Sequence, residues 1–149
     1  MDEQRRKDLI EIQELFNALT KNAALDWHHH DETGLSLNQV FILELLEREG
    51  QTRPSDLASV MQITTGGITS LCQRLVEKQF IVKVADQEDR RVIRLAVTEK
   101  GKEVLKKALL ARDMMVDRLF GSLEKSDIDY LKRIGKQLLR ASHVREESN

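Results

Sequence analysis

The chain has 149 residues, of which 40% are hydrophobic and 33% are charged, and its formal net charge is −1. This composition predicts a folded, soluble protein made of one domain with appended helices, and it excludes a disordered or membrane-spanning chain. The single cysteine, Cys72, excludes an internal disulfide framework.

The first predicted element is a long amphipathic helix over residues 2–29. Its apolar residues recur at spacings of three and four, the period of a helix with one apolar face; they are Leu9, Ile12, Phe16, Leu19 and Ala23. The sequence Asp-Glu-Thr-Gly at residues 31–34 should end this helix.

Two shorter helices are predicted next. Ser36 is followed three positions later by Gln39, which is a capping-box pattern, and the helix that it starts should end at Gly50. Pro54 suits the first turn of a helix that reaches Met61, because its missing N–H would be unpaired there in any case.

A turn at residues 62–64 leads into a further predicted helix, from Thr65 to Lys78. Every third or fourth residue of this helix is apolar, so one side should pack on the core. The inner stripe consists of Ile68, Leu71, Cys72 and Leu75, and the outer face carries Gly66, Thr69, Ser70, Gln73 and Glu77.

The period then changes to that of strands. Residues 81–84 and 92–97 predict two strands joined by a highly charged turn that begins at Asp86. Thr98 should cap a long helix over residues 99–120, and Ser126 with Asp129 forms a capping-box pattern that predicts a last helix over residues 126–142.

The order of these elements predicts a mainly α fold with a small two-stranded β wing, namely a winged helix-turn-helix with long N- and C-terminal dimerisation helices. The expected boundaries are residues 35–98 for a DNA-binding lobe and residues 1–34 and 99–149 for the dimerisation helices. The first helix would be roughly 40 Å long at about 1.5 Å per residue. A winged domain cannot cover that length, whereas a second chain can.

Basic charge is concentrated in the middle of the chain. Residues 1–73 carry 6 basic and 12 acidic side chains, whereas residues 74–107 carry 10 basic and 6 acidic ones. A local basic patch favours DNA binding more than the total charge opposes it, although a solvated charged face is the simpler alternative. The helix at residues 65–78 could enter a major groove, and the charged turn could reach a phosphate or the minor groove.

The residues of the wing resemble the MarR (multiple antibiotic resistance regulator) family. That family shows the pattern D-x-R-x-x-x-L-x-(apolar)-T, which is met here by Asp89, Arg91, Leu95, Val97 and Thr98, and the following Glu-Lys-Gly continues its T-E-K-G. The sequences Ser-Asp-Leu-Ala at 55–58, Gly-Ile-Thr at 67–69 and Arg-Leu-Val-Glu-Lys at 74–78 are also similar to the family. The resemblance covers essentially the whole chain.

The chain departs from the family at two places. Gln79 and Phe80 stand where the family commonly has a glycine after the recognition helix, so a left-handed turn there would be slightly costly. Ser70 stands where an arginine or another large polar residue is frequent. The set of base-reading side chains is therefore small.

The resemblance implies which residues bind DNA. The recognition helix would contribute Thr65, Gly66, Thr69, Ser70, Gln73 and Arg74, and the wing would contribute Arg90 and Arg91. We assign Arg90 to the minor groove and Asp89 with Arg91 to support of the wing. Arg74 would either touch phosphate or pair with an acidic wing residue.

Three further features of the sequence each have a structural interpretation and a functional one. Cys72 is expected to be a buried apolar residue rather than a redox sensor. The run His28-His29-His30 is not expected to bind metal, because adjacent helical residues point in different directions. Trp27 and His28 lie where the family has its effector crevice, although Trp27 could simply be packed.

The resemblance implies a homodimeric transcription repressor that binds a pseudo-palindromic operator in double-stranded DNA and is released by a small amphipathic or phenolic effector. The alternative is a winged-helix protein-interaction module that does not bind DNA. No nucleophile–base pair or phosphate-cradling loop indicates an enzyme, and no cofactor is expected. The N-terminus, Met-Asp-Glu-Gln, lacks the apolar core of a signal peptide, so we expect a cytoplasmic protein without membrane contact.

Overall fold

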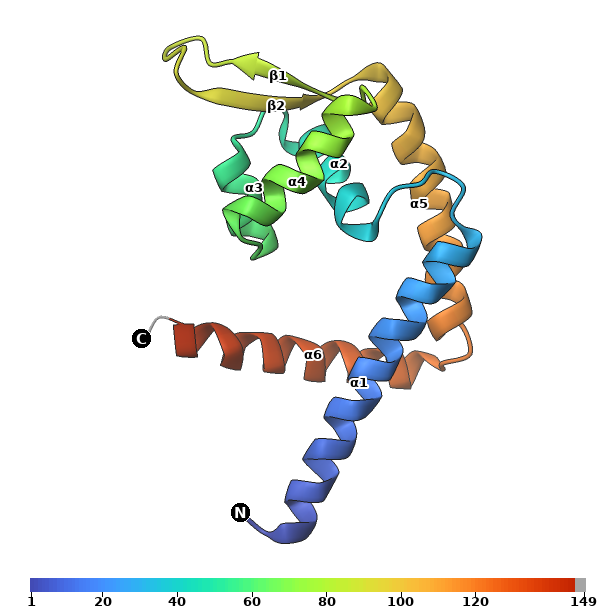
Figure 1. The fold of residues 1–149 in the computed structure, drawn as a ribbon. Coiled ribbons are helices and arrows are strands. Elements are labelled where there is room, and N and C mark those ends of the chain that lie inside the picture. The colour runs from blue at the N-terminus through green and yellow to red at the C-terminus, as the bar shows by residue number, and fades with distance from the viewer. Residues whose placement is uncertain (147–149) are drawn as a thin grey trace. The chain divides into compact units, whose positions relative to one another are not determined.

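The computed structural model describes residues 1–146, and the side chains of residues 1–142, and it has the predicted order of elements (Figure 1). The elements are α1 (Glu3–His30), α2 (Leu37–Glu49), α3 (Pro54–Met61), α4 (Thr65–Glu77), β1 (Ile81–Ala85), β2 (Ile93–Val97), α5 (Glu99–Phe120) and α6 (Lys125–Glu146). The described part is thus mainly helical with one two-stranded antiparallel sheet. The chain divides into two compact units, Met1–Met115 and Val116–Asn149.

The helix ends of the first unit lie close to where local sequence predicts them. The capping box of α2 is formed: Gln39 N donates to Ser36 Oγ at 3.2 Å, and Ser36 N donates to Gln39 Oε1 at 3.0 Å. The helix ends at Gly50, whose φ of 79° suits a residue without a side chain. Thr98 caps α5, because its Oγ1 accepts a hydrogen bond from Gly101 N at 3.0 Å.

The predicted start of α6 is wrong. The helix begins at Lys125, and its first backbone hydrogen bond runs from Ile128 N to Glu124 O at 3.1 Å. Ser126 therefore lies inside the first turn rather than at the cap. The carboxylate of Asp129 contacts Lys125 Nζ at 2.6 Å, one helical turn away, so the acidic group that suggested a capping box forms an ion pair. The helix also extends beyond the predicted residue 142, to Glu146.

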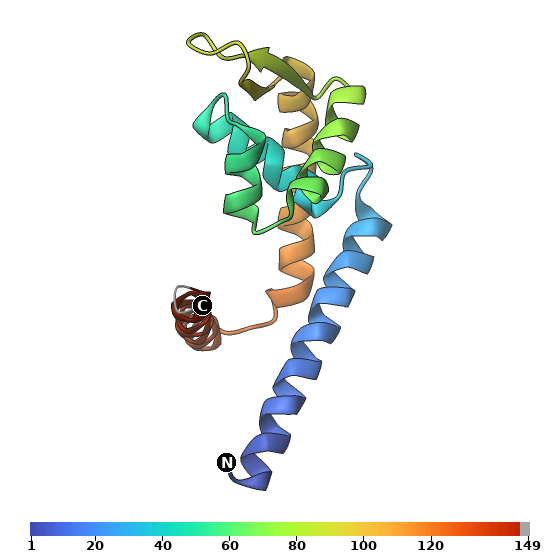
Figure 2. The same cartoon turned by 60° about the vertical axis from the view of Figure 1, so that its left-hand side comes forward.

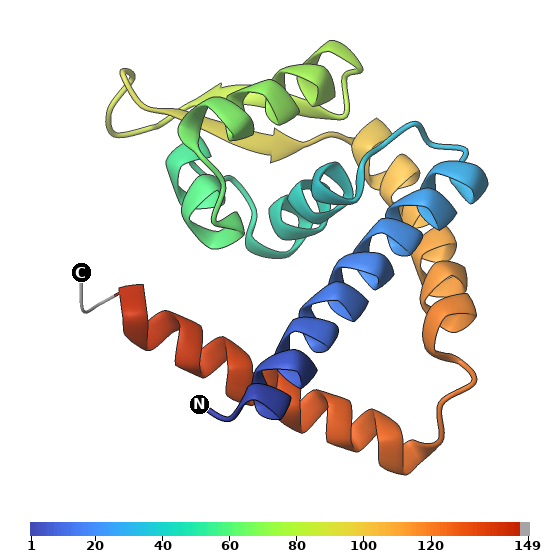
Figure 3. The same ribbon diagram turned by 60° about the horizontal axis from the view of Figure 1, so that its bottom comes forward.

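The core of the first unit is formed where α2, α3 and α4 pack against the two strands. The helices α3 and α4 pack on each other, α2 lies against β2, and α4 lies against β1 (Figure 2, Figure 3). The largest fully buried side chains are Val40, Ile42, Leu43 and Leu46 of α2, Leu57 of α3, Ile68 and Leu75 of α4, Ile81 of β1 and Leu95 of β2. An ion pair joins α5 to this core, since Arg112 Nη1 lies 2.7 Å from Glu44 Oε2.

The long α1 leaves its apolar stripe uncovered. Leu9, Ile12, Phe16 and Leu19 are each about half exposed, and Trp27 is the one residue of this helix that is buried. In the second unit, α6 exposes Ile128, Tyr130, Leu131, Ile134, Leu138 and Leu139. Within the described residues, no helix is both long enough and apolar enough to span a membrane.

Candidate nucleic-acid interface

The helix α4 separates an apolar inner side from a polar outer face. Ile68, Cys72 and Leu75 are buried on the inner side, and the predicted outer residues Gly66, Thr69, Ser70, Gln73 and Glu77 are all exposed. The N-cap is Thr64, whose Oγ1 accepts from Gly67 N at 3.1 Å. Thr65 is the first helical residue and is also exposed. The face predicted to read bases is therefore free of contacts with the core.

The far end of α4 is held by the first turn of α5. After α4, Gln79 adopts a φ of 63°, so the left-handed turn that the family builds with glycine is present with glutamine. Thr98 Oγ1 donates to Gln79 O at 2.7 Å, and Thr98 N donates to Phe80 O at 3.0 Å. A Cβ atom on Gly101 would lie only 2.0 Å from Phe80 O. The threonine and glycine of the wing motif thus fix the direction in which α4 ends.

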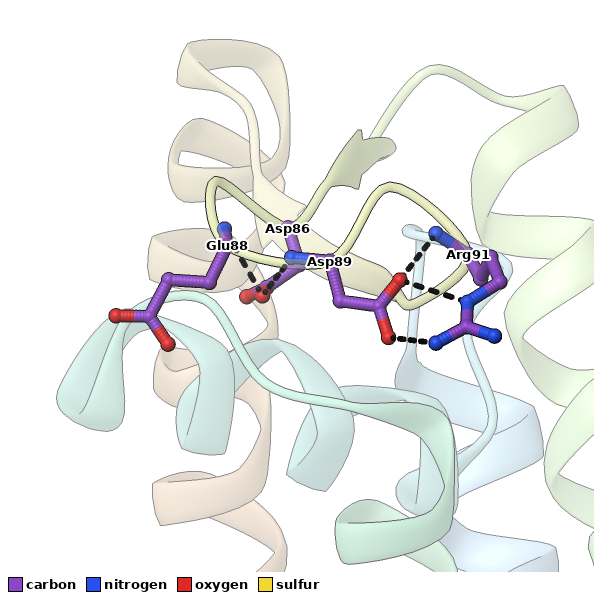
Figure 4. A network of polar contacts seen from close by, with 4 residues as sticks. All are labelled: Asp86, Glu88, Asp89 and Arg91. Atoms are coloured by element: carbon purple, nitrogen blue, oxygen red, sulfur yellow. Dashed lines mark hydrogen bonds and ion pairs between the residues drawn. The ribbon is translucent and has the colours of Figure 1, made fainter.

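The wing is a regular hairpin with an ordered loop. Its strands pair from Ile81 with Val97 to Ala85 with Ile93. In the loop, Asp86 Oδ2 accepts from the backbone N–H groups of Glu88 at 3.3 Å and Asp89 at 3.1 Å (Figure 4). The charged turn is therefore held by its own aspartates.

Asp89 and Arg91 form a two-point contact at the tip of the wing. Asp89 Oδ1 accepts from Arg91 Nε, and Asp89 Oδ2 accepts from Arg91 Nη2, both at 3.0 Å (Figure 4). The hydrogen bond from Arg91 lowers the pKa of the Asp89 carboxyl below its usual value. The Arg91 side chain is still 91% exposed, so this contact fixes geometry more than it stabilises the fold.

Arg90 differs from its neighbour in having no partner. Its side chain is exposed, and none of the described residues forms a hydrogen bond or ion pair with it. A guanidinium group at the tip of a hairpin with no internal partner is available to an anion outside the fold. The assignment of Arg90 to DNA and of Arg91 to the wing stays a prediction, with which these contacts are compatible.

A stronger brace of the wing was not predicted from the sequence. Arg94 Nε lies 2.6 Å from Asp86 Oδ1, and Arg94 Nη1 lies 3.5 Å from Gln51 O. Beside it, Thr52 pairs with Leu95 through two backbone hydrogen bonds, so the wing is tied to the segment between α2 and α3. The one signal in the sequence was an arginine between Ile93 and Leu95, on a strand that is otherwise apolar.

A cavity of about 610 Å³ lies between the end of α1, residues 31–39 and Arg74 of α4. Trp27 and His28 both line it, and so do Asp31 and Gln39. Trp27 is buried, and its Nε1 donates to Leu35 O at 2.7 Å, so this residue is packed and also forms part of the wall. Arg74 is exposed on α4 and also lines the cavity, so a cation of the recognition helix lies beside the cavity.

Cys72 and the three consecutive histidines were the other residues for which a functional role was considered. Cys72 is buried, and burial raises the pKa of its thiol, as expected of a packed apolar residue. His28 and His29 have ring centroids 6.1 Å apart, and His30 Nδ1 lies 2.9 Å from Asp26 O. In the part of the chain that the structure describes, no three metal-ligating side chains come together.

Comparison with known proteins extends these observations. The profile of the MarR family matches residues 35–93, which span the helices α2–α4 and the wing. The chain is 37% identical over 71 residues to the uncharacterized HTH-type transcriptional regulator YpoP of Bacillus subtilis, a match that covers 48% of this chain and half of that relative's length. It is 26% identical over 119 residues to the HTH-type transcriptional repressor MdtR of the same organism, covering 80% of this chain and 77% of MdtR.

A similar fold is found in a solved complex with DNA. The crystal structure of a mutant of MarR from Escherichia coli with operator DNA superposes with a TM-score of 0.80, covering 89% of this chain and 96% of that one at 17% sequence identity.

Proposed function

The chain belongs to the MarR family of DNA-binding transcription regulators, and on this premise we propose that it represses transcription as a homodimer bound to a pseudo-palindromic operator. The observation that carries the proposal is that α4 has an exposed outer face and that the guanidinium of Arg90, at the tip of a braced wing, has no partner among the described residues. A helix of this kind fits the major groove, and an arginine at a hairpin tip fits the minor groove.

The helix α4 and the wing have different roles in DNA binding. The outer face of α4 reads bases with Thr65, Gly66, Thr69, Ser70 and Gln73. Arg90 enters the minor groove, while Asp89 and Arg91 shape the loop that presents it. Arg74, which is exposed and lies beside the cavity, contributes positive charge at the flank of α4.

The dimer is built from the long terminal helices. Residues 1–34 and 99–149 form the dimerisation part and residues 35–98 the DNA-binding lobe. The support is the apolar surface that α1 and α6 leave exposed in a single chain, which includes Phe16, Leu19, Leu131 and Leu138. Surface of that extent marks an interface. A twofold dimer presents two α4 helices to successive turns of the duplex. The dimer acts in the cytoplasm, where the DNA is.

The cavity beside Trp27 and His28 is the proposed effector site. It combines an aromatic wall with a guanidinium group, that of Arg74, and thus suits a small amphipathic or phenolic compound that carries an acidic group. An effector between α1 and α4 changes the position of the recognition helix relative to the dimerisation helices. The effector causes release of DNA to the extent that it binds the DNA-free conformation more tightly than the DNA-bound one.

The DNA-binding claim is tested with the full chain and a duplex taken from the DNA that flanks its own gene. We expect a saturable complex with two chains per duplex, and an affinity that falls steeply between 50 and 200 mM salt, by a factor of about 10³ if some six phosphates are contacted. A chain that binds no DNA at any salt concentration contradicts the proposal and supports the protein-interaction module instead.

The dimer is tested independently by sedimentation at micromolar concentration. We expect twice the mass of the 17.2 kDa chain. A compact monomer contradicts the proposed assembly even if DNA is bound.

The effector site is tested through Trp27, which is the only tryptophan of the chain and thus reports on the cavity by its fluorescence. We expect 4-hydroxybenzoate to change this emission and to weaken DNA binding, and the uncharged 4-hydroxybenzamide to do so less, because it lacks the charge that Arg74 would pair with. The role of Arg74 would be contradicted if both compounds had equal effects. It would also be contradicted if 4-hydroxybenzoate affected an Arg74→Ala variant as strongly as it affects the wild type.

A further inference from the structure

The outer face of α4 has an unusual chemical content for a helix that reads DNA. All of α4 is described, and its one cationic residue, Arg74, lines the cavity beside α1. Lys78, which follows the helix, lies on the side of the α1–α2 segment, because its Nζ would be 3.4 Å from a Cβ atom on Gly34. Arginine and lysine are the side chains that read guanine through its O6 and N7 atoms. None of the outer-face residues Gly66, Thr69, Ser70, Gln73 and Glu77 carries such a cationic group, and the exposed Arg74 lies at the edge of this face.

Gln73 is the largest polar side chain on that face, and a hydrogen bond within the helix orients its amide. Its Nε2 donates to Glu77 Oε1 at 3.2 Å, one helical turn further along. A carboxylate only accepts hydrogen bonds, so the amide cannot turn its oxygen toward Glu77 without repulsion. The amide oxygen and the second N–H of Nε2 are thus left for a ligand outside the protein. One acceptor and one donor on a planar amide match the N6 amino group and the N7 atom of adenine.

Thr69 lies one turn before Gln73 on the same face. Its Oγ1 donates to Thr65 O at 2.8 Å, so the hydroxyl proton is already used within the helix. The groups that remain for a ligand are the methyl group and the lone pairs of the hydroxyl oxygen. A threonine methyl group suits the C5-methyl group of thymine.

We propose that α4 recognises A·T base pairs, with Gln73 reading an adenine in an orientation set by Glu77 and Thr69 packing on a thymine methyl group. This inference rests on the proposed function, because it needs α4 to lie in the major groove. Glu77 is a positioning residue and makes no contact with a base. Gly66, Thr69 and Gln73 lie within eight residues, and the seven rises between the first and the last give about 10 Å of helix, which is about three base-pair steps of 3.4 Å.

The test is selection of binding sequences from a random duplex library by the full chain and its variants. The wild type should enrich a pseudo-palindrome that has an adenine at one fixed position in each half-site. Gln73→Ala should enrich the same motif without a preference at that position, because a bidentate contact of this kind discriminates about 5- to 150-fold. Alanine is favourable in a helix and Gln73 is exposed, so this variant folds.

Two further variants separate the roles. Glu77→Gln should bind all duplexes somewhat more tightly, since a negative charge near phosphate is removed, and should lose part of the adenine preference because the amide of Gln73 can then turn. Gln87→Ala makes the same chemical change as Gln73→Ala at the exposed wing loop and should keep the adenine preference in full.

The outcomes that overturn the inference are distinct from those that overturn the proposed function. A Gln73→Ala variant that still requires the adenine, or a wild-type motif with guanine at the positions sensitive to Gln73, overturns the inference alone. A Glu77→Gln variant with an unchanged preference overturns the positioning role. A wild-type chain that enriches no motif overturns the proposed function and the inference together.

Discussion

Asp86 and Arg94 face each other across the base of the wing, with Arg94 Nε 2.6 Å from Asp86 Oδ1. Both side chains are partly buried, and the second carboxylate oxygen of Asp86 accepts hydrogen bonds from two backbone N–H groups of the loop. This carboxylate is thus the point at which β2, the loop and the end of β1 are joined. The wing can present Arg90 only as long as this point is intact.

The stability contributed by Asp86 should depend on pH. The hydrogen bond from Arg94, followed by those from the loop backbone, lowers the pKa of Asp86 below its usual value. Because the folded-state pKa is below the value in the unfolded chain, about 3.9, the contribution is fully present above that pH and is lost as the pH falls through the folded-state pKa. The free energy of unfolding in urea should therefore be larger for the wild type than for Asp86→Asn at pH 7. This difference should shrink below about pH 4. A difference that does not change with pH would contradict this account.

Gln79→Gly should stabilise the chain. Gln79 has a φ of 63°, and this left-handed conformation costs a residue with a Cβ atom about 1 kcal/mol or more, whereas glycine adopts it freely. We expect the free energy of unfolding to rise by about 1 kcal/mol. Gln87→Gly is the matched control: Gln87 has no positive φ, so glycine there only adds freedom to the unfolded chain and should lower stability. Destabilisation by both changes would show that the turn after α4 is not strained in solution.

Gly101→Ala should be strongly destabilising. The added Cβ atom would lie 2.0 Å from Phe80 O and 2.9 Å from Val97 Cγ2, so the start of α5 and the end of α4 must separate. The expected loss is about 1–3 kcal/mol in thermal or urea unfolding, with weaker DNA binding because the direction of α4 changes. In Gly66→Ala the new atom meets nothing within 4 Å, and stability should rise by about 0.5–1 kcal/mol. Equal stability of the two variants would mean that this contact does not hold α4.

The features that sequence predicts here are the local ones. Ser36 with Gln39, and Thr98, determine helix starts through hydrogen bonds three residues apart, and Pro54 does so through its fixed φ and missing N–H. The predicted positions of these starts are confirmed. The predicted start of α6 at Ser126 was wrong, because a capping pattern close to the true start is equally compatible with a helix that begins one residue earlier.

Contacts that depend on how distant segments meet were not predictable in this way. The pairing of Asp86 with Arg94 depends on strand register, and that of Arg94 with Gln51 O joins segments 43 residues apart. Arg74 and Trp27 line the same cavity because α4 packs near the end of α1, and this arrangement could not be predicted from the sequence.

The central claim is that the wing reads DNA through Arg90 and is shaped by Arg91 and Asp89. The most direct test measures operator affinity and melting temperature for Arg90→Ala and Arg91→Ala beside the wild type. Arg90→Ala should lose about 1–3 kcal/mol of binding free energy per contact, with an unchanged melting temperature, because its side chain has no partner among the described residues. Arg91→Ala should lower the operator affinity and, by a small amount, the melting temperature, since it removes the exposed two-point contact with Asp89. If only Arg91→Ala loses affinity and its melting temperature is unchanged, the two roles are reversed. If Arg90→Ala and Arg91→Ala both bind as the wild type does, the wing does not read DNA.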